Sequence, residues 1–157
     1  MFMRTFFTAL ALLFAAHASS ASAAPAINTL KNSALFASRT DTAINGYDTV
    51  AYFTQSKAVK GSDSFVFQWK EAKWKFASQA NLELFRASPE KYVPQYGGYC
   101  AYGVANGNLV KVDPDQFTVL DGKLYLNYDA DIQQAWKKDI AGFNKLADSK
   151  FQALLAK

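Results

Sequence analysis

The sequence predicts an α+β fold: a single compact domain with two antiparallel β-hairpins, a short helix after the first hairpin and a longer C-terminal helix after the second. Segments of alternating polarity and segments of helical periodicity come in blocks, not in strict alternation. Half of the 157 residues are hydrophobic and 15% are aromatic, which suits a packed core. Residues 43–155 are rich in aromatic side chains throughout, with no linker and no repeat, and form the predicted domain. Residues 24–42 are small and polar and are expected to be a partly flexible lead-in.

The chain begins with the features of an export signal. Arg4 is followed by the apolar run Thr5–Ala16, which is too short to span a bilayer as a helix. Ala21-Ser22-Ala23 fits the A-x-A cleavage pattern. Residues 1–23 are therefore predicted to be a signal peptide, and Ala24 the first residue of the mature protein. A periplasmic or secreted location is expected, without stable membrane insertion after cleavage.

The first predicted hairpin follows a short strand. Val50–Phe53 comes after the turn-forming pair Asn45-Gly46 and is expected to be extended. Ser64–Trp69 and Lys73–Phe76 both alternate, so that the aromatic side chains of each strand share one face. The polar segment Lys70–Ala72 between them suits the turn of a hairpin.

A short helix is predicted next, over Gln79–Ala87. Ser78 can serve as its N-cap, and Leu82 and Phe85 lie three residues apart on one face. Pro89 is expected to end it, because the residue before a proline disfavours helical geometry.

The second hairpin has a clearer turn signal. Phe117–Leu120 and Lys123–Asn127 flank the pair Asp121-Gly122. This pair is typical of a type I′ turn, in which both central residues need a positive φ. A two-residue hairpin is therefore expected.

The C-terminal helix is expected to begin at a cap formed by Asp129 or Asp131. Gly142 lies inside the helical pattern and is expected to bend the helix or to split it in two. An apolar stripe with steps of three or four residues predicts the buried face: Ile132, Trp136, Ile140, Phe143 and Ala147.

Charge and composition exclude several classes of protein. The formal charge is +4, and basic residues are scattered, which argues against nucleic-acid binding. One cysteine cannot form an internal disulfide, a zinc finger or a CxxC redox site within one chain. The single histidine, His17, lies in the predicted signal peptide, so the mature chain has none. Catalysis by Ser-His-Asp or Cys-His is therefore not expected, and no spacing of Asp or Tyr singles out an acid–base pair.

Four motifs in order along the chain resemble the YHS domains of exported bacterial proteins. They are Gly46–Phe53, Trp74–Tyr92, Pro94–Tyr102 and Asp121–Tyr128, and together they cover most of residues 46–128. Many YHS domains, and the related TRASH heavy-metal domains, carry three metal-binding cysteines.

That cysteine pattern, laid on this chain, falls on Ala51, Ala77 and Asn81. All three thiols are replaced. Alanine and asparagine side chains cannot supply the thiolates that soft metals prefer. The resemblance therefore implies a YHS-type protein without the metal site of the family, and no cofactor is expected.

The functional prediction is an exported, non-catalytic binding module. Its pocket is expected near Tyr47, Asp48, Tyr99, Cys100 and Tyr102, with an unknown small molecule or protein as its partner. The alternative for Asp48 is an Asx-turn that holds the start of the domain.

Three interpretations of Cys100 remain open. It can be a buried small hydrophobic residue, a reactive or copper-binding thiol, or the link of a disulfide-bonded dimer. The second of these defines the alternative function, copper handling or thiol redox chemistry.

Overall fold

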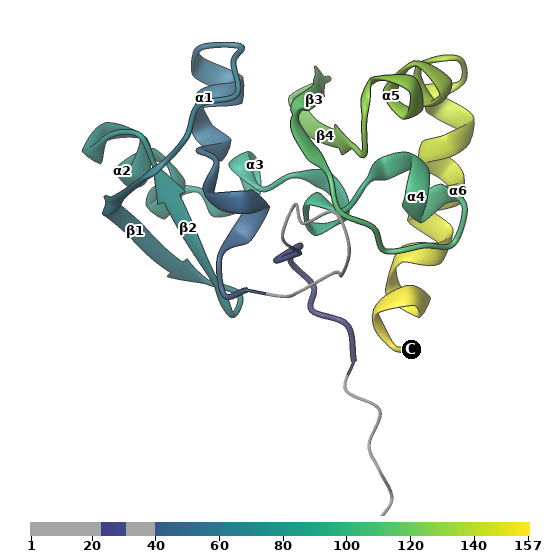
Figure 1. Cartoon of the computed structure of the whole chain (residues 1–157), viewed down its shortest axis with the longest axis horizontal. Helices are drawn as coiled ribbons and strands as arrows, with labels where there is room; N and C mark the ends of the chain where they lie inside the picture. The colour runs from purple at the N-terminus through teal and green to yellow at the C-terminus, as the bar shows by residue number, and fades with distance from the viewer. Residues whose placement is uncertain (1–22, 31–39) are drawn as a thin grey trace, which may run out of the picture.

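The structure, a computed structural model, describes residues 23–30 and 40–157 (Figure 1). The predicted signal peptide lies outside the described residues, apart from Ala23. Two two-stranded antiparallel sheets are combined with helices, so the predicted α+β fold is confirmed. In the described part of the chain, no helix is both long and apolar enough to cross a membrane.

The order of elements occurs twice. The first half contains η1 (Ala43–Gly46), α1 (Thr49–Thr54), β1 (Ser62–Trp69), β2 (Ala72–Phe76), α2 (Gln79–Ala87) and α3 (Pro89–Tyr92). The second half contains η2 (Gln95–Gly98), α4 (Ala101–Ala105), β3 (Asp113–Leu120), β4 (Lys123–Asn127), α5 (Ala130–Lys137) and α6 (Ile140–Leu155). Each half therefore runs from a 3-10 turn through a short helix and a hairpin into two further helices.

The two halves agree in detail. Both hairpins pair a strand of 8 residues with one of 5, and both have one register shift, between Ser62 and Val66 and between Asp113 and Phe117. The aromatic core is repeated as well. The rings of Trp74 and Phe85 lie 4.9 Å apart at 32°, and those of Tyr125 and Trp136 lie 5.2 Å apart at 39°. The expectation of no repeat was wrong for the structure, because the order of elements, the hairpin geometry and one aromatic pair recur although few residues are identical.

The predicted strand at Val50–Phe53 is also wrong, because these residues lie in α1. The Asp48 carboxylate caps this helix and accepts hydrogen bonds from the backbone N–H groups of Val50 and Ala51. The cap satisfies N–H groups that have no partner within the helix. Capping and burial thus outweigh the strand preference of valine and the aromatic residues.

Both predicted hairpins are present. The first turns at Lys70 and Glu71, which have φ of 46° and 62°, and Ala72 is the first residue of β2 and not part of the turn. The second turns at Asp121 and Gly122, with φ of 50° and 71°. Positive φ at both central residues is the geometry of a type I′ turn, which matches the twist of the strands.

The C-terminal helical region is split, as expected, but not at Gly142. The break lies at Lys138 and Asp139, between α5 and α6. Asp139 caps α6 and accepts a hydrogen bond from the Gly142 N–H at 2.9 Å. A Cβ atom at Gly142 would meet the Asp139 Oδ2 at 2.1 Å, so the glycine makes room for this cap. Asp129, one of the two predicted caps, begins α5.

The segment 24–30, part of the predicted lead-in, packs between the two halves (Figure 1). Ile27 belongs to the core around Trp74 and Phe85, and Leu30 belongs to the core around Tyr125 and Trp136. We call residues 24–30 the N-terminal segment. It contributes to both cores, and its positions 27–30 are all buried.

Backbone hydrogen bonds fix the N-terminal segment. The Asn28 N–H donates to the Gly97 carbonyl at 2.8 Å, and the Asn28 side chain donates to the Gly98 carbonyl at 2.9 Å. The Asn28 carbonyl in turn accepts from the Ile44 N–H at 3.1 Å. The segment therefore bridges η1 of the first half and η2 of the second.

Candidate functional site

Asp48 is fully buried, and its carboxylate accepts four hydrogen bonds. Oδ1 accepts from the backbone N–H groups of Val50 at 2.9 Å and Ala51 at 3.2 Å. Oδ2 accepts from the Ala77 N–H at 2.8 Å and from the Asn81 side-chain amide at 2.7 Å. The carboxylate joins the start of α1 to the end of β2 and the start of α2. Both oxygens are engaged within the fold, so the role of Asp48 is structural.

Cys100 occupies the position in the second half that Asp48 occupies in the first. Each follows a Gly-Tyr pair and caps the next helix. The Cys100 sulfur accepts a hydrogen bond from the Gly103 N–H at 3.3 Å, and the Asn127 side-chain amide lies 4.0 Å from it. The Tyr128 N–H also faces the sulfur. This N–H group of Tyr128 corresponds to the Ala77 N–H, which donates to Asp48 in the first half.

The thiol of Cys100 is poorly placed for chemistry. It is 1% exposed, and burial raises its pKa above the ordinary value. A raised pKa keeps the thiol protonated at neutral pH, whereas the thiolate is the nucleophile and the metal ligand. An intermolecular disulfide would first require local opening of the fold.

We expect Cys100 to resist labelling in the folded protein. With a disulfide reagent at about pH 8, the reaction should be at least ~1000-fold slower than that of free cysteine, because the sulfur is buried and protonated. In denaturant the rate should become that of an exposed thiol. Fast labelling of the folded chain would contradict the structural role and revive the redox alternative.

The three predicted tyrosines lie in different surroundings. Tyr47 is half-buried, with the Lys60 Nζ 4.5 Å from the centre of its ring. Tyr99 is buried, and its hydroxyl donates to the Pro25 carbonyl at 3.0 Å. Tyr102 is half-buried, with its ring 4.9 Å from that of Phe143. None of the five predicted site residues lines any of the three hollows described next.

The largest of these hollows, which we call the cleft, has a volume of about 440 Å³. It lies where the N-terminal segment, α3, η2 and α6 meet, beside the turn between β1 and β2. Its lining residues are Ala26, Ile27, Lys70, Glu90, Val93, Pro94, Gln95, Tyr96, Gly97, Asp148, Phe151, Gln152 and Leu155. The volume is within the range of small-molecule sites.

Two polar pairs lie at the cleft, one part-buried and one largely exposed. The Tyr96 hydroxyl donates to the Asp148 Oδ1 at 3.0 Å, and Lys70 and Glu90 form an ion pair at 2.9 Å. Burial, together with the hydrogen bond to Asp148, raises the pKa of Tyr96. Tyr96 therefore stays a neutral phenol at physiological pH.

The backbone of η2 is strained beside the cleft. Tyr96 and Gly97 have φ of 56° and 60°, and a positive φ is unfavourable for tyrosine. Such strain occurs at ligand-binding positions that the surrounding structure over-determines. Here the surrounding structure is the N-terminal segment, which is hydrogen-bonded to Gly97.

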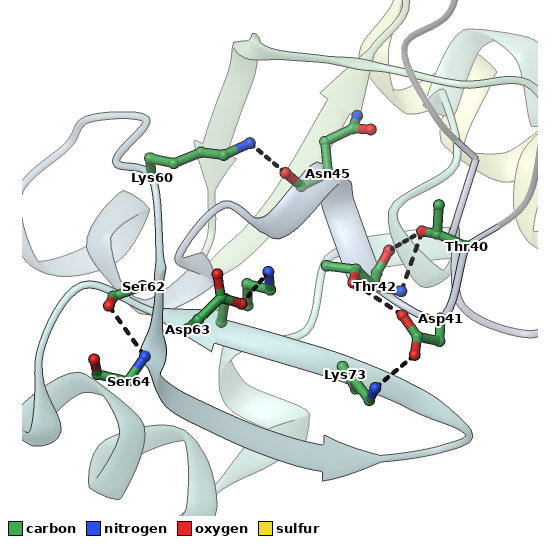
Figure 2. A network of polar contacts seen from close by, with 10 residues as sticks. Thr40, Asp41, Thr42, Asn45, Lys60, Ser62, Asp63, Ser64 and Lys73 are labelled. Carbon is green, nitrogen blue, oxygen red and sulfur yellow. Dashed lines mark hydrogen bonds and ion pairs between the residues drawn. The ribbon is translucent and has the colours of Figure 1, made fainter.

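A smaller hollow of about 280 Å³ lies beside η1. Polar side chains around η1 and the first hairpin form a network of hydrogen bonds and ion pairs at the surface (Figure 2). Lys60 Nζ donates to the Asn45 carbonyl at 2.5 Å, and Lys73 pairs with Asp41 at 2.6 Å. The hydrogen bond from Lys73 lowers the pKa of Asp41. Lys73 and Asp41 are well exposed, and exposed ion pairs contribute little to stability. A third hollow, also about 280 Å³, lies between Pro25 and the first hairpin turn.

No residue of the cleft is among the predicted site residues, including the hydrogen-bonded pair Tyr96 and Asp148. Tyr96 was one tyrosine among eight. Asp148 lies three, four and seven positions before Phe151, Gln152 and Leu155, so these side chains share one face of α6. The same spacing is typical of any helix surface and does not by itself indicate a pocket.

Within residues 23–30 and 40–157, no group of three or more His, Cys, Asp or Glu side chains could hold a metal ion. No family model matches the chain, and neither a curated protein nor a solved structure is significantly similar to it.

Proposed function

We propose that this protein is an exported, non-catalytic binding module of the YHS type, and that it binds a small molecule in the cleft. The single observation that carries the binding role is the cleft itself: about 440 Å³, with the Tyr96–Asp148 hydrogen bond at 3.0 Å fixing one side. Its lining combines polar and apolar side chains, and a concave site with a few placed polar groups is a candidate for small-molecule binding.

The surroundings of Asp48 support the YHS-type proposal. The positions at which the family has metal-binding cysteines are Ala51 in α1, and Ala77 and Asn81 around the start of α2. All three donate hydrogen bonds to the carboxylate of Asp48, at 3.2, 2.8 and 2.7 Å. In this proposal a hydrogen-bonded carboxylate occupies the place of the metal, and the binding role belongs to the cleft.

The charges of the cleft favour a ligand with an ammonium group. Lys70 and Glu90 neutralise each other. No ion pair joins the Asp148 carboxylate to a basic side chain in the described part of the chain, and its Oδ2 accepts no hydrogen bond there. Val93, Phe151 and Leu155 are partly exposed and offer apolar surface in the same cleft. We therefore propose ligands that combine a short apolar body with a primary amine.

Calorimetric titration with hexylammonium and with hexanoate tests this proposal. Hexylammonium is expected to bind with a dissociation constant on the order of 1 mM, and hexanoate at least ~10-fold more weakly. Asp148→Asn keeps an acceptor for Tyr96 but removes the charge, so it should weaken hexylammonium binding about 5- to 10-fold.

The matched control is Asp131→Asn, which removes an exposed carboxylate from the first turn of α5, outside the cleft. It should leave binding unchanged. Equal binding of the two probes, or equal losses in the two variants, would refute the cleft as the site.

A further inference from the structure

We infer that cleavage between Ala23 and Ala24 creates an α-ammonium group that caps the C-terminus of α6 and thereby fixes one wall of the cleft. The Ala24 nitrogen donates a hydrogen bond to the carbonyl of Leu155, the last residue of α6, at 2.9 Å. The inference rests on the export part of the proposed function. Hydrolysis of this peptide bond by a signal peptidase of the host consumes one water: the leader leaves with a carboxylate at Ala23, and the Ala24 nitrogen takes up protons to become an ammonium group at the same place.

A helix C-terminus is where a positive charge is most favourable. The last four carbonyl groups of a helix lack partners within the helix, and the aligned peptide dipoles give that end a partial negative charge. At 16 residues, α6 is the longest helix in the described part of the chain. An ammonium group also has three donors, so it can keep the bond to Leu155 and make it charge-assisted.

The residues that follow Ala24 form part of the wall of the cleft. The Pro25 carbonyl accepts from the Tyr99 hydroxyl at 3.0 Å, and Ala26 and Ile27 line the cleft together with Leu155. The contact at Ala24 thus fixes the outer end of the N-terminal segment, and the bonds of Asn28 fix its inner end. Processing therefore adds a charge to an existing anchor of the cleft wall.

Few other groups titrate in the range of an α-amine, which ordinarily has a pKa near ~8. The charged residues of α6 are Lys145, Asp148 and Lys150, and Lys157 follows the helix. The other titratable groups on neighbouring elements are Tyr96 and Tyr99 near η2, and Lys70 and Glu90 at the cleft. Ordinary carboxyl groups titrate near ~4, and lysine and tyrosine near ~10. The processed chain has no histidine, and burial raises the pKa of Cys100.

The sign of the pH effect follows from this geometry. The negative end of α6 favours the charged amine, so folding raises the pKa of the amine above its unfolded value. The stabilisation is complete below the unfolded value near ~8 and is lost as the pH rises through the folded value.

Export of the full chain from a bacterial host gives the first test. Mass spectrometry of the exported protein should find Ala24 as its first residue. A different first residue, or a retained leader, would overturn the inference.

The second test compares this processed chain, which retains all helices and strands, with the same chain acetylated on its α-amino group. Acetylation removes the charge and keeps an N–H donor. At about pH 6.5 and low salt, the free amine should raise the melting temperature by about 2–4 °C. The difference should vanish near pH 9.5 and shrink in ~0.5 M salt. Equal melting temperatures at about pH 6.5 would overturn the anchor.

Hexylammonium titration of both chains separates this inference from the proposed function. If hexylammonium binds but acetylation leaves the melting temperature unchanged, the anchor is refuted and the binding role stands. A stabilising amine without binding would keep the anchor and refute the binding role.

Discussion

Asp48→Ala is expected to lower the free energy of unfolding by about 3–5 kcal/mol, the largest effect of any single substitution discussed. The change leaves the donors of Val50, Ala51, Ala77 and Asn81 without an acceptor in a fully buried place. The melting temperature should fall by roughly 10–20 °C, as measured by circular dichroism.

A reciprocal exchange provides the control for Asp48. Asp48→Asn alone should also destabilise the fold, because its amide turns a donor toward Ala77 or Asn81. Adding Asn81→Asp returns an acceptor and should recover part of the loss, which a double-mutant cycle measures. An Asp48→Ala protein of nearly normal stability that has lost ligand binding would show that Asp48 belongs to a binding site instead.

Gly97→Ala is expected to lower the free energy of unfolding by about 2–4 kcal/mol and to weaken binding in the cleft. Its added Cβ would lie 1.8 Å from the Ala26 carbonyl oxygen and 2.9 Å from the Ala26 carbonyl carbon. Since Gly97 also has a φ of 60°, the N-terminal segment must move away. Denaturant unfolding and hexylammonium titration measure the two effects.

Gly122→Ala is the matched control for Gly97. Gly122 has a similar φ of 71°, and no atom lies within 4 Å of its added Cβ. It should cost only about 1 kcal/mol, the conformational penalty without the clash. Equal losses in the two variants would mean that the contact between η2 and the N-terminal segment contributes nothing to stability.

Local sequence signals predicted most of the second half of the domain and the centre of the first. The Asp121-Gly122 turn and the Ser78-capped helix depend on neighbouring residues only, and both are present. The predicted strand at Val50–Phe53 was wrong because these residues form a helix capped by Asp48. Asp48 is itself hydrogen-bonded to Ala77 and Asn81, about 30 positions further along the chain. The repeat was missed because it exists in the order and geometry of the elements and is scarcely visible as identity between residues.

The candidate site was harder to predict for the same reason. The motif residues Asp48, Tyr99 and Cys100 were selected for a pocket, but the structure places them in the interior as hydrogen-bonding groups. The cleft draws its walls from Ala26 to Leu155, near the two ends of the domain. Contacts between such distant segments cannot be predicted from the spacing of residues that are neighbours in the sequence.

The central claim is that the cleft, and not the thiol, is the binding site. Amide NMR spectra of the ¹⁵N-labelled processed chain, recorded during titration with hexylammonium and separately with Cu(I), test it most directly. With hexylammonium we expect saturable shifts at Tyr96, Gly97 and residues 148–155, and with Cu(I) no stoichiometric change. Saturation by Cu(I) with shifts centred on Cys100 and Gly103, and no response of the cleft to hexylammonium, would contradict it.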